Sequence, residues 1–411
     1  MKFERYPIAP QIKINLEKKG WRRPTDIQFK AIPHILKGED LLAIAQTGTG
    51  KTAAFAIPVI NSLEARKNPK RDDGIRCIVM APTHELAIQI NGVFEDLSKG
   101  TGIKTYCIHG GVDQEPQIAK LEKGFDILIA TPGRLFDLVS QGHLKLHRVD
   151  TLVLDEADHM LDLGFIKDIE QLVDWLPKQR QTLFFSATIN DKIKDLAYSL
   201  VKNAIRIQIS PKNPVARNIN HFVSFITMDD KRFFLERLIN ENPEKKILVF
   251  VRTKVRAERV CTAMERVEIG SETIHSDKDQ KNRSAVMERF RTGENKVLVA
   301  TDVSARGIDI PSVDYVVNYD LPELTENYVH RVGRTGRGDK KGMAVTFCSE
   351  QERELLEEIE GFLGSPIEEM AIDKDAYSDT LSGSSESHSD WKTLIRDNEE
   401  DLKKKRKKKK K

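Results

Sequence analysis

The sequence has few cysteines, no long apolar run and no leader-like start. Its four cysteines, Cys77, Cys107, Cys261 and Cys348, are scattered singly among 411 residues, without CxxC or Cys/His ligand spacing. Such thiols are typical of buried, reduced side chains rather than of a disulfide framework or a metal site. No apolar run approaches the roughly 20 residues that a membrane span needs, and the start, MKFERYPIAP, lacks the apolar core of a signal peptide. We therefore expect a globular, cytoplasmic protein without a membrane partner.

The body of the chain also lacks an excess of positive charge. The formal net charge is +3, but residues 403–411 (KKKRKKKKK) are nine consecutive basic residues, so residues 1–402 carry a net charge of −6. Binding to a polyanion must therefore depend on local patches and on this basic run. The run has three interpretations, a localisation signal, a solubilising end or a tether for nucleic acid, and the motifs described below favour the tether.

A repeated pattern of short apolar runs is present instead, with helical segments between the runs. The runs are apolar on both faces and end in polar turns, which is typical of strands in a buried parallel sheet. In the first half they are DLLAIAQ (40–46), RCIVMAP (76–82), FDILIATP (125–132), TLVLDEAD (151–158) and QTLFFSAT (181–188). In the second half they are HFVSFIT (221–227), KILVFVRT (246–253), SETIHS (271–276), KVLVATD (296–302), YVVNYDL (315–321) and MAVTFCS (343–349).

Two domains explain this repetition. A chain of 411 residues exceeds what one hydrophobic core usually organises, and the Pro- and Asn-rich stretch SPKNPVARN (210–218) separates the two sets of runs. We predict an α/β fold with tandem domains at residues 1–209 and 221–373, joined by a linker at 210–220. Each domain would be a mostly parallel sheet flanked by helices.

The apolar pattern stops near residue 374. The stretch SDTLSGSSESHSD (378–390) is Ser-rich and has too little apolar content to bury, so a flexible tail is predicted over residues 374–411. Within it, WKTLI (391–395) has two interpretations, a short docking segment or an unstructured stretch, and the composition favours the second.

The first apolar run leads directly into AQTGTGKT (45–52), a glycine-rich loop closed by Lys51 and Thr52. Small residues allow backbone N–H groups to approach phosphate oxygens, Lys51 can reach the β and γ phosphates, and the Thr52 hydroxyl suits Mg²⁺. The general pattern begins with glycine where this chain has Ala45, but a strand before the loop and a helix after it are the context that such a loop requires. The predicted phosphate-binding residues are Thr47, Gly48, Thr49, Gly50, Lys51 and Thr52.

A second motif, LVLDEAD (152–158), places Asp155 directly after three apolar residues. Asp155 can hold Mg²⁺ through water, and Glu156 can orient or deprotonate the attacking water. An isolated Asp-Glu pair at a strand end is more often a helix cap than a catalytic site. Together with the glycine-rich loop it predicts nucleotide hydrolysis.

These two motifs, with others in a fixed order, give the chain a close resemblance to the DEAD-box RNA helicases. The further motifs are GWRRPTDIQ (20–28), PTHELA (82–87), GG (110–111), TPGRL (131–135), SAT (186–188), ATDVSARGID (300–309) and HRVGRTGR (330–337). The resemblance covers residues 1 to about 370. It implies two RecA-like domains, ATP and Mg²⁺ as cofactors, RNA as the partner and a monomeric state. The short frame and the long basic end resemble the bacterial RhlE-like subgroup most.

The resemblance also implies roles for residues around the nucleotide. Gln28 would hydrogen-bond the adenine edge, with which an amide can pair through two hydrogen bonds. Phe3 would stack on the adenine ring, and Asp309 would reach the ribose. The residues implied in coupling the nucleotide site to RNA and the domains to each other are Asp158, Ser186, Ala187, Thr188 and His330.

By the same resemblance, RNA would lie along both domains. Contacts to phosphates and sugars position RNA without reading its sequence, so little sequence specificity is expected. The implied RNA-binding residues are Pro82, Thr83, His84, Gly110, Gly111, Thr131, Pro132, Gly133 and Arg134 in the first domain, and Arg283 and Thr301 in the second.

The motif HRVGRTGR sets Arg331, Arg334 and Arg337 at three-residue steps, and such close positive charges repel unless an anion faces them. The second domain has no P-loop, so the anion facing Arg334 and Arg337 is predicted to be the γ-phosphate of ATP held by the first domain. Arginine fingers of this kind are worth on the order of 10³ to 10⁵ in rate. His330 and Arg331 are expected to be structural or interdomain links.

One position departs from the family pattern. Where the family usually has PTRELA, this chain has His84 in place of arginine, and an ordinary imidazole is mostly neutral at pH 7 and reaches less far. His84 would then weaken RNA binding or make it depend on pH. The alternative, which we favour, is that neighbouring backbone amides carry the contact and His84 is tolerated.

Three functions fit these motifs. The main hypothesis is an ATP-dependent RNA helicase whose RNA-stimulated hydrolysis is coupled to local unwinding of short duplexes. The alternative is an ATP-gated RNA clamp or assembly platform with little unwinding. A DNA translocase shares the two-domain architecture, but the GWRRPTDIQ and SAT motifs resemble the RNA-acting family more closely.

Overall fold

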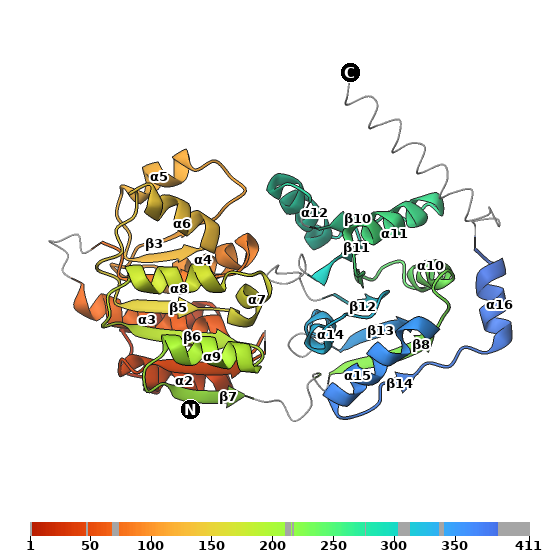
Figure 1. Cartoon of the computed structure of the whole chain (residues 1–411), viewed down its shortest axis with the longest axis horizontal. Helices are drawn as coiled ribbons and strands as arrows, with labels where there is room; N and C mark the ends of the chain where they lie inside the picture. The colour runs from red at the N-terminus through yellow and green to blue at the C-terminus, as the bar shows by residue number, and fades with distance from the viewer. Residues whose placement is uncertain are drawn as a thin grey trace, which may run out of the picture.

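Two α/β domains lie side by side in the computed structural model (Figure 1). The structure describes residues 2–46, 48–67, 74–209, 215, 218–275, 277–302, 313–336 and 341–384. The predictions for Thr47, Asp309, Arg337 and the basic run 403–411 lie outside these residues.

Within the described residues, the first domain is built on a seven-stranded parallel sheet with the order β3-β4-β2-β5-β6-β1-β7. Its strands are β1 (Leu41–Ala45), β2 (Cys77–Met80), β3 (Thr105–Ile108), β4 (Ile127–Ala130), β5 (Thr151–Leu154), β6 (Gln181–Ser186) and β7 (Ile205–Ile209). Its helices are α1 (Pro10–Lys18), α2 (Asp26–Leu36), α3 (Lys51–Arg66), α4 (His84–Ser98), α5 (Glu115–Leu121), α6 (Pro132–Ser140), α7 (Ala157–Asp162), α8 (Ile166–Trp175) and α9 (Asp191–Leu200), preceded by a 3₁₀ turn at Phe3–Arg5.

The second domain repeats this design over its described part, with the strand order β10-β11-β9-β12-β13-β8-β14 and parallel pairing throughout. Its strands are β8 (Ile219–Phe225), β9 (Ile247–Phe250), β10 (Glu272–Ile274), β11 (Val297–Ala300), β12 (Tyr315–Asn318), β13 (Gly342–Cys348) and β14 (Glu368–Glu369). Its helices are α10 (Lys231–Glu241), α11 (Lys254–Arg266), α12 (Gln280–Thr292), α14 (Thr325–Val332), α15 (Arg353–Leu363) and α16 (Lys374–Ser382), with a 3₁₀ turn at Glu350–Glu352.

The predicted fold class is confirmed, and the structure adds strands that the pattern of apolar runs missed. β3 is only partly buried over most of its length, and β7 alternates buried with exposed positions. β14 is a two-residue edge strand of Glu368 and Glu369, both exposed. None of the three is a continuous apolar run, which was the signal used to find the others.

Two predicted boundaries are wrong in part. The linker was expected to extend to residue 220, but β8 begins at Ile219 because it pairs with β13 from its first residue. The flexible tail was expected to begin at residue 374, but residues 374–382 form α16. Asp373 caps this helix by accepting a hydrogen bond from the backbone N–H of Ala376, and the Tyr377 ring packs on Phe234 of α10 at 4.8 Å between centroids.

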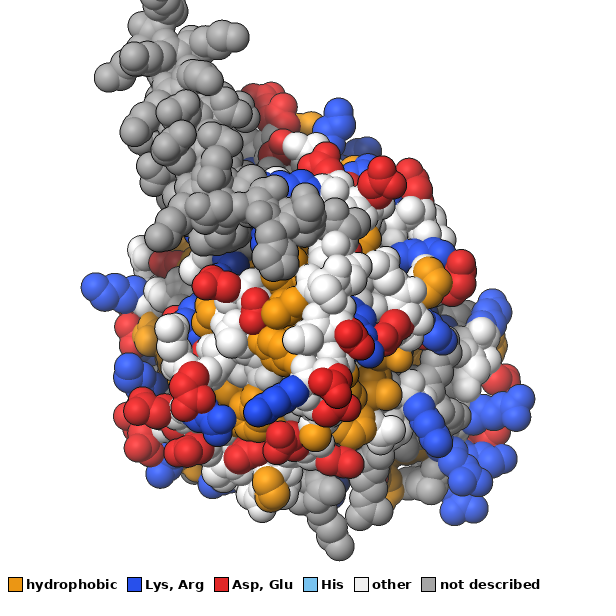
Figure 2. Space-filling model, turned by 90° about the vertical axis from the view of Figure 1, so that its right-hand side faces the viewer, with side chains coloured by type: hydrophobic (Ala, Val, Ile, Leu, Met, Phe, Trp, Pro, Cys, Tyr) orange, Lys and Arg blue, Asp and Glu red, His pale blue; other side chains and the backbone are white. Residues whose placement is uncertain are grey.

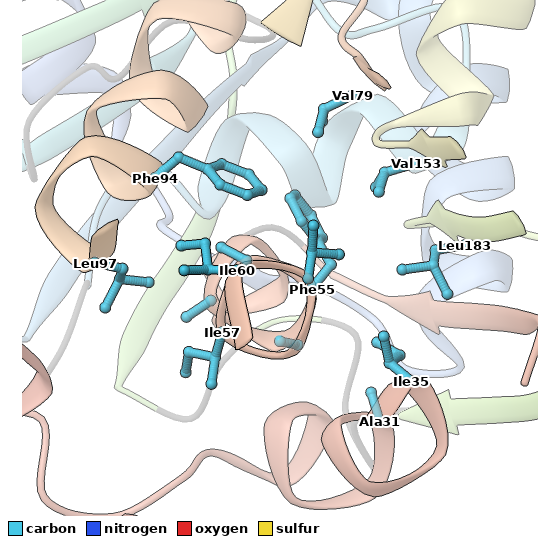
Figure 3. Close-up of a cluster of buried hydrophobic side chains, with 14 of the residues drawn as sticks. Ala31, Ile35, Phe55, Ile57, Ile60, Val79, Phe94, Leu97, Val153 and Leu183 are labelled. Carbon is cyan, nitrogen blue, oxygen red and sulfur yellow. The ribbon is translucent and has the colours of Figure 1, made fainter. Parts of the chain in front are cut away.

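The central strands are buried on both faces, so each sheet has a hydrophobic core on either side. In the first domain one core lies between the sheet and helices α2, α3 and α4, as the close-up in Figure 3 shows. Phe55 of α3 is fully buried there, and its ring lies 5.2 Å from that of Phe185 and 6.0 Å from that of Phe94. Aromatic pairs at such distances stabilise beyond the area that they bury. This packing fixes the helix that follows the glycine-rich loop.

The C-terminal part of the second domain is tied to its sheet by a buried ion pair. The Nζ atom of Lys231, fully buried, lies 2.5 Å from an Oε atom of Glu352 and donates to the carbonyl of Tyr319. Removing one partner of such a pair leaves an uncompensated buried charge. The pair therefore fixes the turn before α15 against α10.

No described helix is long and apolar enough to cross a lipid bilayer. The four cysteines are all free, with Cys77 and Cys348 buried and Cys107 and Cys261 half-buried. Burial raises the pKa of the Cys107 thiol to about 12 and that of the Cys261 thiol to about 11. Thiols with raised pKa values are poorly reactive.

Phe55→Ala is expected to lower the free energy of unfolding of the first domain by about 3–5 kcal/mol, because it leaves a cavity in the close-packed core. Urea unfolding followed by the fluorescence of Trp21 and Trp175 measures this change. Phe29→Ala is the matched control, because the Phe29 side chain of α2 is 50% exposed. Equal losses for the two variants would contradict the assignment of Phe55 to the core.

Candidate active site

The strand order of the first domain sorts the sequence motifs into two neighbouring groups. In a parallel sheet all carboxyl ends meet at one edge, and ligands bind along that edge. The loops after β1, β5 and β6 carry the glycine-rich loop, the DEAD motif and the SAT motif, whereas the loops after β3, β4 and β2 carry the GG, TPGRL and PTHELA motifs. The predicted nucleotide residues and the predicted RNA residues thus occupy adjoining halves of one edge.

The glycine-rich loop brings Lys51 into a buried position at the first turn of α3. The residue is only 6% exposed, and its Nζ atom has no hydrogen-bond partner among the described residues. A buried ammonium group without a partner is costly unless an anion pairs with it. Thr49 closes the loop by donating from Oγ1 to the carbonyl of Gln46 at 2.7 Å. The geometry fits a site for phosphate.

Gln28 links this loop to α2. Its Oε1 atom accepts from the backbone N–H of Thr25 at 3.1 Å, and its Nε2 atom donates to the carbonyl of Gly50 at 3.1 Å. Gly50 has φ of +93°, and a Cβ atom there would lie 2.5 Å from Gln28 Nε2. An amide has two donor hydrogens and two acceptor lone pairs, so one of each remains for a ligand.

A pocket of about 630 Å³ opens between this loop and the GWRRPTDIQ segment. Its lining includes Gly20, Trp21, Arg22, Arg23, Thr25, Gln28, Gly48, Gly50, Thr52, Ala53 and Val93. Sequence reasoning singled out Gln28 and the loop but missed Trp21, Arg22 and Arg23, although they belong to the same quoted motif. Phe3 is 4% exposed, packs on Tyr6 at 6.0 Å between ring centroids, and lies in the hydrophobic core. Its implied stacking on a nucleotide ring remains a prediction.

Asp155 and Glu156, the first two residues of the DEAD motif, are both buried, but their pKa values are shifted in opposite directions. Burial raises the pKa of Asp155 to about 6, although the nearby Lys51 charge acts in the opposite direction. For Glu156 burial also acts to raise the pKa, but His159, Lys51 and Arg334 outweigh it and lower the pKa to about 2. The Nδ1 atom of His159 lies 3.6 Å from the Glu156 carboxylate. Glu156 is therefore a carboxylate at neutral pH.

The backbone at Glu156 is in the left-handed region, with φ of 51° and ψ of 50°. Non-glycine residues adopt this conformation at a cost of roughly 1–3 kcal/mol, and such residues cluster at functional sites. The conformation lets the Glu156 N–H donate to Asp155 Oδ1 at 3.0 Å. The strain thus positions the two carboxylates relative to each other.

Asp158 connects the DEAD motif to the SAT motif. Its Oδ2 atom accepts from the backbone N–H groups of Ala187 and Thr188, both at 3.0 Å, and from the Thr188 hydroxyl at 3.2 Å. Ser186 Oγ donates to the Thr188 carbonyl at 2.8 Å. The implied coupling residues Asp158, Ser186, Ala187 and Thr188 therefore form one hydrogen-bonded unit at the ends of β5 and β6.

The second domain presents its arginines from α14 and the following turn. Arg331 is 1% exposed and makes a two-point contact with Asp302, at 2.5 Å from Nε and 2.8 Å from Nη2, while Nη1 donates to the Asp320 carbonyl. This fork–fork geometry fixes the guanidinium and the end of the helix. Arg334 is 6% exposed, and its charge is one of those that lower the pKa of Glu156 in the other domain. The arginine motif therefore faces the DEAD motif across the domain boundary.

The predicted RNA residues of the first domain lie after β2, β3 and β4, at neighbouring strand ends. Thr83 caps α4 by accepting a hydrogen bond from the Leu86 N–H at 3.3 Å. The His84 ring packs on the ring of His109, the residue just before the GG loop, at 5.3 Å between centroids. Gln117, which sequence reasoning missed, holds that loop through hydrogen bonds with the backbone N–H and carbonyl of His109.

Arg134 is held next to the GG loop. Its Nη2 atom donates to the Val112 carbonyl at 2.8 Å, while its Nε and Nη1 atoms are buried and have no hydrogen-bond partner among the described residues. Thr131, at the N-cap of the same helix, is 4% exposed. Donors that are buried without partners suit an anionic ligand.

Arg283 of α12, predicted to contact RNA, makes an ion pair across the domain boundary. Its Nη2 atom lies 2.8 Å from Oε1 of Glu85, which follows His84 in the first turn of α4. Both side chains are largely buried, at 16% and 13% exposed. Thr301 is 9% exposed at the end of β11. Arg283 therefore ties the second domain to the predicted RNA surface of the first.

Gly50→Ala is expected to weaken ATP binding at least tenfold, because the new methyl group would displace the Gln28 amide and strain the loop. Gly92→Ala is the control, because Gly92 lies in α4 with open space around it. Titration with a fluorescent ATP analogue measures the dissociation constant. Unchanged binding in Gly50→Ala would contradict the role given to the contact between Gly50 and Gln28.

The chain matches two family models and many known proteins. The model described as DEAD/DEAH box helicase matches residues 25–196, and that described as helicase conserved C-terminal domain matches residues 230–339. The ATP-dependent RNA helicase RhlB of Shewanella amazonensis is 40% identical over 382 residues, which cover 92% of this chain and 87% of that protein. The DEAD-box ATP-dependent RNA helicase RhpA of Helicobacter pylori strain B128 is 42% identical over 358 residues, which cover 86% of this chain and 70% of that protein.

Both domains together resemble a solved structure. The S. cerevisiae protein Dbp5, solved with RNA and ADP BeF3, superposes with a TM-score of 0.81 at 30% identity, covering 92% of this chain and 97% of that one. The RhlE-like subgroup remains a prediction. The two family models, the relatives at about 40% identity and the DEAD sequence at residues 155–158 place the chain in the DEAD/DEAH box helicase family.

Proposed function

We propose that this chain is an ATP-dependent RNA helicase whose catalytic site is completed only when the second domain supplies Arg334. The observation that carries the proposal is the contact between the domains, in which Arg283 pairs with Glu85 at 2.8 Å and the Arg334 charge lies close enough to Glu156 to lower its pKa. Glu156, ionised at neutral pH, would orient the attacking water by accepting its hydrogen bond. Arg334 would stabilise the charge that develops on the transferring phosphoryl group.

The first domain would hold the nucleotide. Lys51, buried without a partner among the described residues, would pair with phosphate oxygens, and Gln28 would use its remaining donor and acceptor on the adenine edge. The pocket beside Trp21 would take the base and ribose.

Asp155 and Thr52 fit a magnesium ion. Mg²⁺ is usually held by one or two carboxylates together with substrate phosphates, and Asp155 is a buried carboxylate close to Lys51. When bound, the ion would neutralise charge on the phosphate oxygens. Thr52 follows Lys51 in the first turn of α3 and would supply a hydroxyl ligand.

RNA would lie across the loops after β2, β3 and β4 and reach α12 of the second domain. Dbp5, similar over both domains, was solved with RNA bound, and the donors of Arg134 and the N-terminus of α4 suit phosphate.

Closure around RNA and ATP would make each ligand raise the affinity of the other, as linkage requires. Asp158 and its SAT partners would connect the two ligand sites. The predicted cytoplasmic location agrees with these two ligands.

RNA is expected to stimulate ATP hydrolysis by the wild type, and Glu156→Gln and Arg334→Ala are expected to lose that stimulation by about 10³-fold or more. Arg353→Ala is the matched control, because Arg353 of α15 is half-exposed and pairs with Glu350. Steady-state hydrolysis with and without single-stranded RNA provides the measurement, and release of a short duplex in the same reaction separates a helicase from an RNA clamp. A rate of ATP hydrolysis that RNA does not change, or RNA stimulation that persists in Arg334→Ala, would refute the proposal.

His84→Arg is expected to tighten single-stranded RNA binding no more than an added charge elsewhere on the surface does, because neighbouring backbone amides carry the contact at this position. A specific phosphate contact by the new arginine would instead tighten binding about tenfold and steepen the salt dependence by roughly 0.7 in the slope of log affinity against log salt concentration, and would contradict this expectation. Tyr198→Arg, at a 53% exposed position of α9, controls for the added charge. Equal gains in both variants would mean that position 84 makes no specific RNA contact.

A further inference from the structure

The outer face of the second domain has an apolar groove that the helicase mechanism does not use. Figure 2 shows this face, where hydrophobic side chains gather within a rim of charged ones. Two adjoining hollows, of about 460 Å³ and 330 Å³, share Arg237, Glu241 and Ala376 as lining residues and lie along α10 and α16. We call them together the α10–α16 groove.

The floor and rim of the groove differ in character. Apolar lining comes from Phe234 and Leu238 of α10, Met343 of β13, and Met370 and Ile372 of the segment between β14 and α16. Met370 is 41% exposed, which is unusual for a large apolar side chain in a hollow. The rim at the first hollow contains three carboxylates, Glu236, Glu241 and Asp379, and one guanidinium, Arg237. Arg237 pairs with Glu241 at 2.7 Å, so Glu236 and Asp379 leave this rim with a net negative charge. The groove thus suits an apolar segment that carries positive charge.

The last described residues of the chain lie in this groove. Gly383 and Ser384, at the end of the described residues, line the first hollow, and Ser384 Oγ donates to Glu236 Oε2 at 2.6 Å. The segment WKTLI (391–395) follows after only six intervening residues. Its apolar residues Trp391, Leu394 and Ile395 have the i, i+3, i+4 spacing of a helix face.

We propose that Trp391–Ile395 docks in the α10–α16 groove of the same chain. Lys392 and Arg396 would face the carboxylates of the rim, and Trp391 and its apolar neighbours would cover Met370 and Ile372. Seven residue steps span at most about 25 Å, whereas α10 with its 11 residues is about 16 Å long, so the whole groove lies within reach. A short tether also supplies an effective concentration of the order of millimolar. Docking would hold the start of the basic run 403–411 at the second domain.

A disulfide trap in the full-length chain tests this proposal. Asn240→Cys, at an exposed position that lines the groove, is combined with Lys392→Cys. The control combines Lys392→Cys with Glu357→Cys, an exposed position of α15 in the same domain but outside the groove. Intramolecular disulfide formation is expected to be at least tenfold faster for the pair at 240 and 392 than for the control pair. The triple variant Trp391→Ser, Leu394→Ser, Ile395→Ser is expected to remove the difference.

The other outcomes would overturn the proposal. Equal rates for the two pairs would mean that the segment does not occupy the groove, which would leave it for a different partner. A disulfide between chains that grows with concentration would mean that a second copy docks there. A fast reaction at position 240 that survives the three serines would mean that charge attraction alone brings the segment close. Circular dichroism of each variant checks that the domain remains folded.

Discussion

The proposed catalytic centre depends on a balance of buried charges to which both domains contribute. Asp155 and Glu156 are buried carboxylates, and the first domain sets one ammonium group, Lys51, near them. The Arg334 charge adds to this balance from the second domain. Phosphates of ATP bring several further negative charges, so a second cation becomes valuable when the nucleotide is present. In the proposed function, this need for charge compensation links hydrolysis to the approach of the second domain.

We propose that the sheet topology makes the approach of the second domain depend on RNA, because the predicted RNA site adjoins the nucleotide site. The loops after β1, β5 and β6 surround the nucleotide residues, and the loops after β3, β4 and β2 form the adjoining half of the same edge. Asp158 lies in the DEAD motif and holds the backbone of Ala187 and Thr188. On the second domain, Arg331 is fixed by Asp302, while Arg283 pairs with Glu85 beside His84. By the proposed function, ligands at either half of the edge would favour the same arrangement of the domains.

Much of this site could be predicted from the sequence, because its predicted residues lie at the ends of apolar runs or in the loops that follow them. Asp155 directly follows β5, Ser186 ends β6 and Lys51 follows the loop after β1, and parallel strands bring those ends together. The ion pair between Glu85 and Arg283 joins residues of different domains, so no local pattern in the sequence predicts it. Nor does composition predict α16, whose polar residues become helical because Asp373 caps them and Tyr377 packs on α10. The packing of the Phe3 ring on Tyr6 in the core also leaves no signal in the sequence, and the implied stacking of Phe3 on adenine remains a prediction.

The central claim, that ATP and RNA together bring Arg334 to the DEAD motif, is tested most directly by the distance between the domains. Fluorophores on Lys120→Cys and Glu357→Cys, both at exposed positions, would report it by energy transfer in the full chain. The account predicts a high-transfer state only when a non-hydrolysable ATP analogue and single-stranded RNA are both present, and its loss in Arg334→Ala. A transfer efficiency that is the same with no ligand, with one ligand and with both would contradict it.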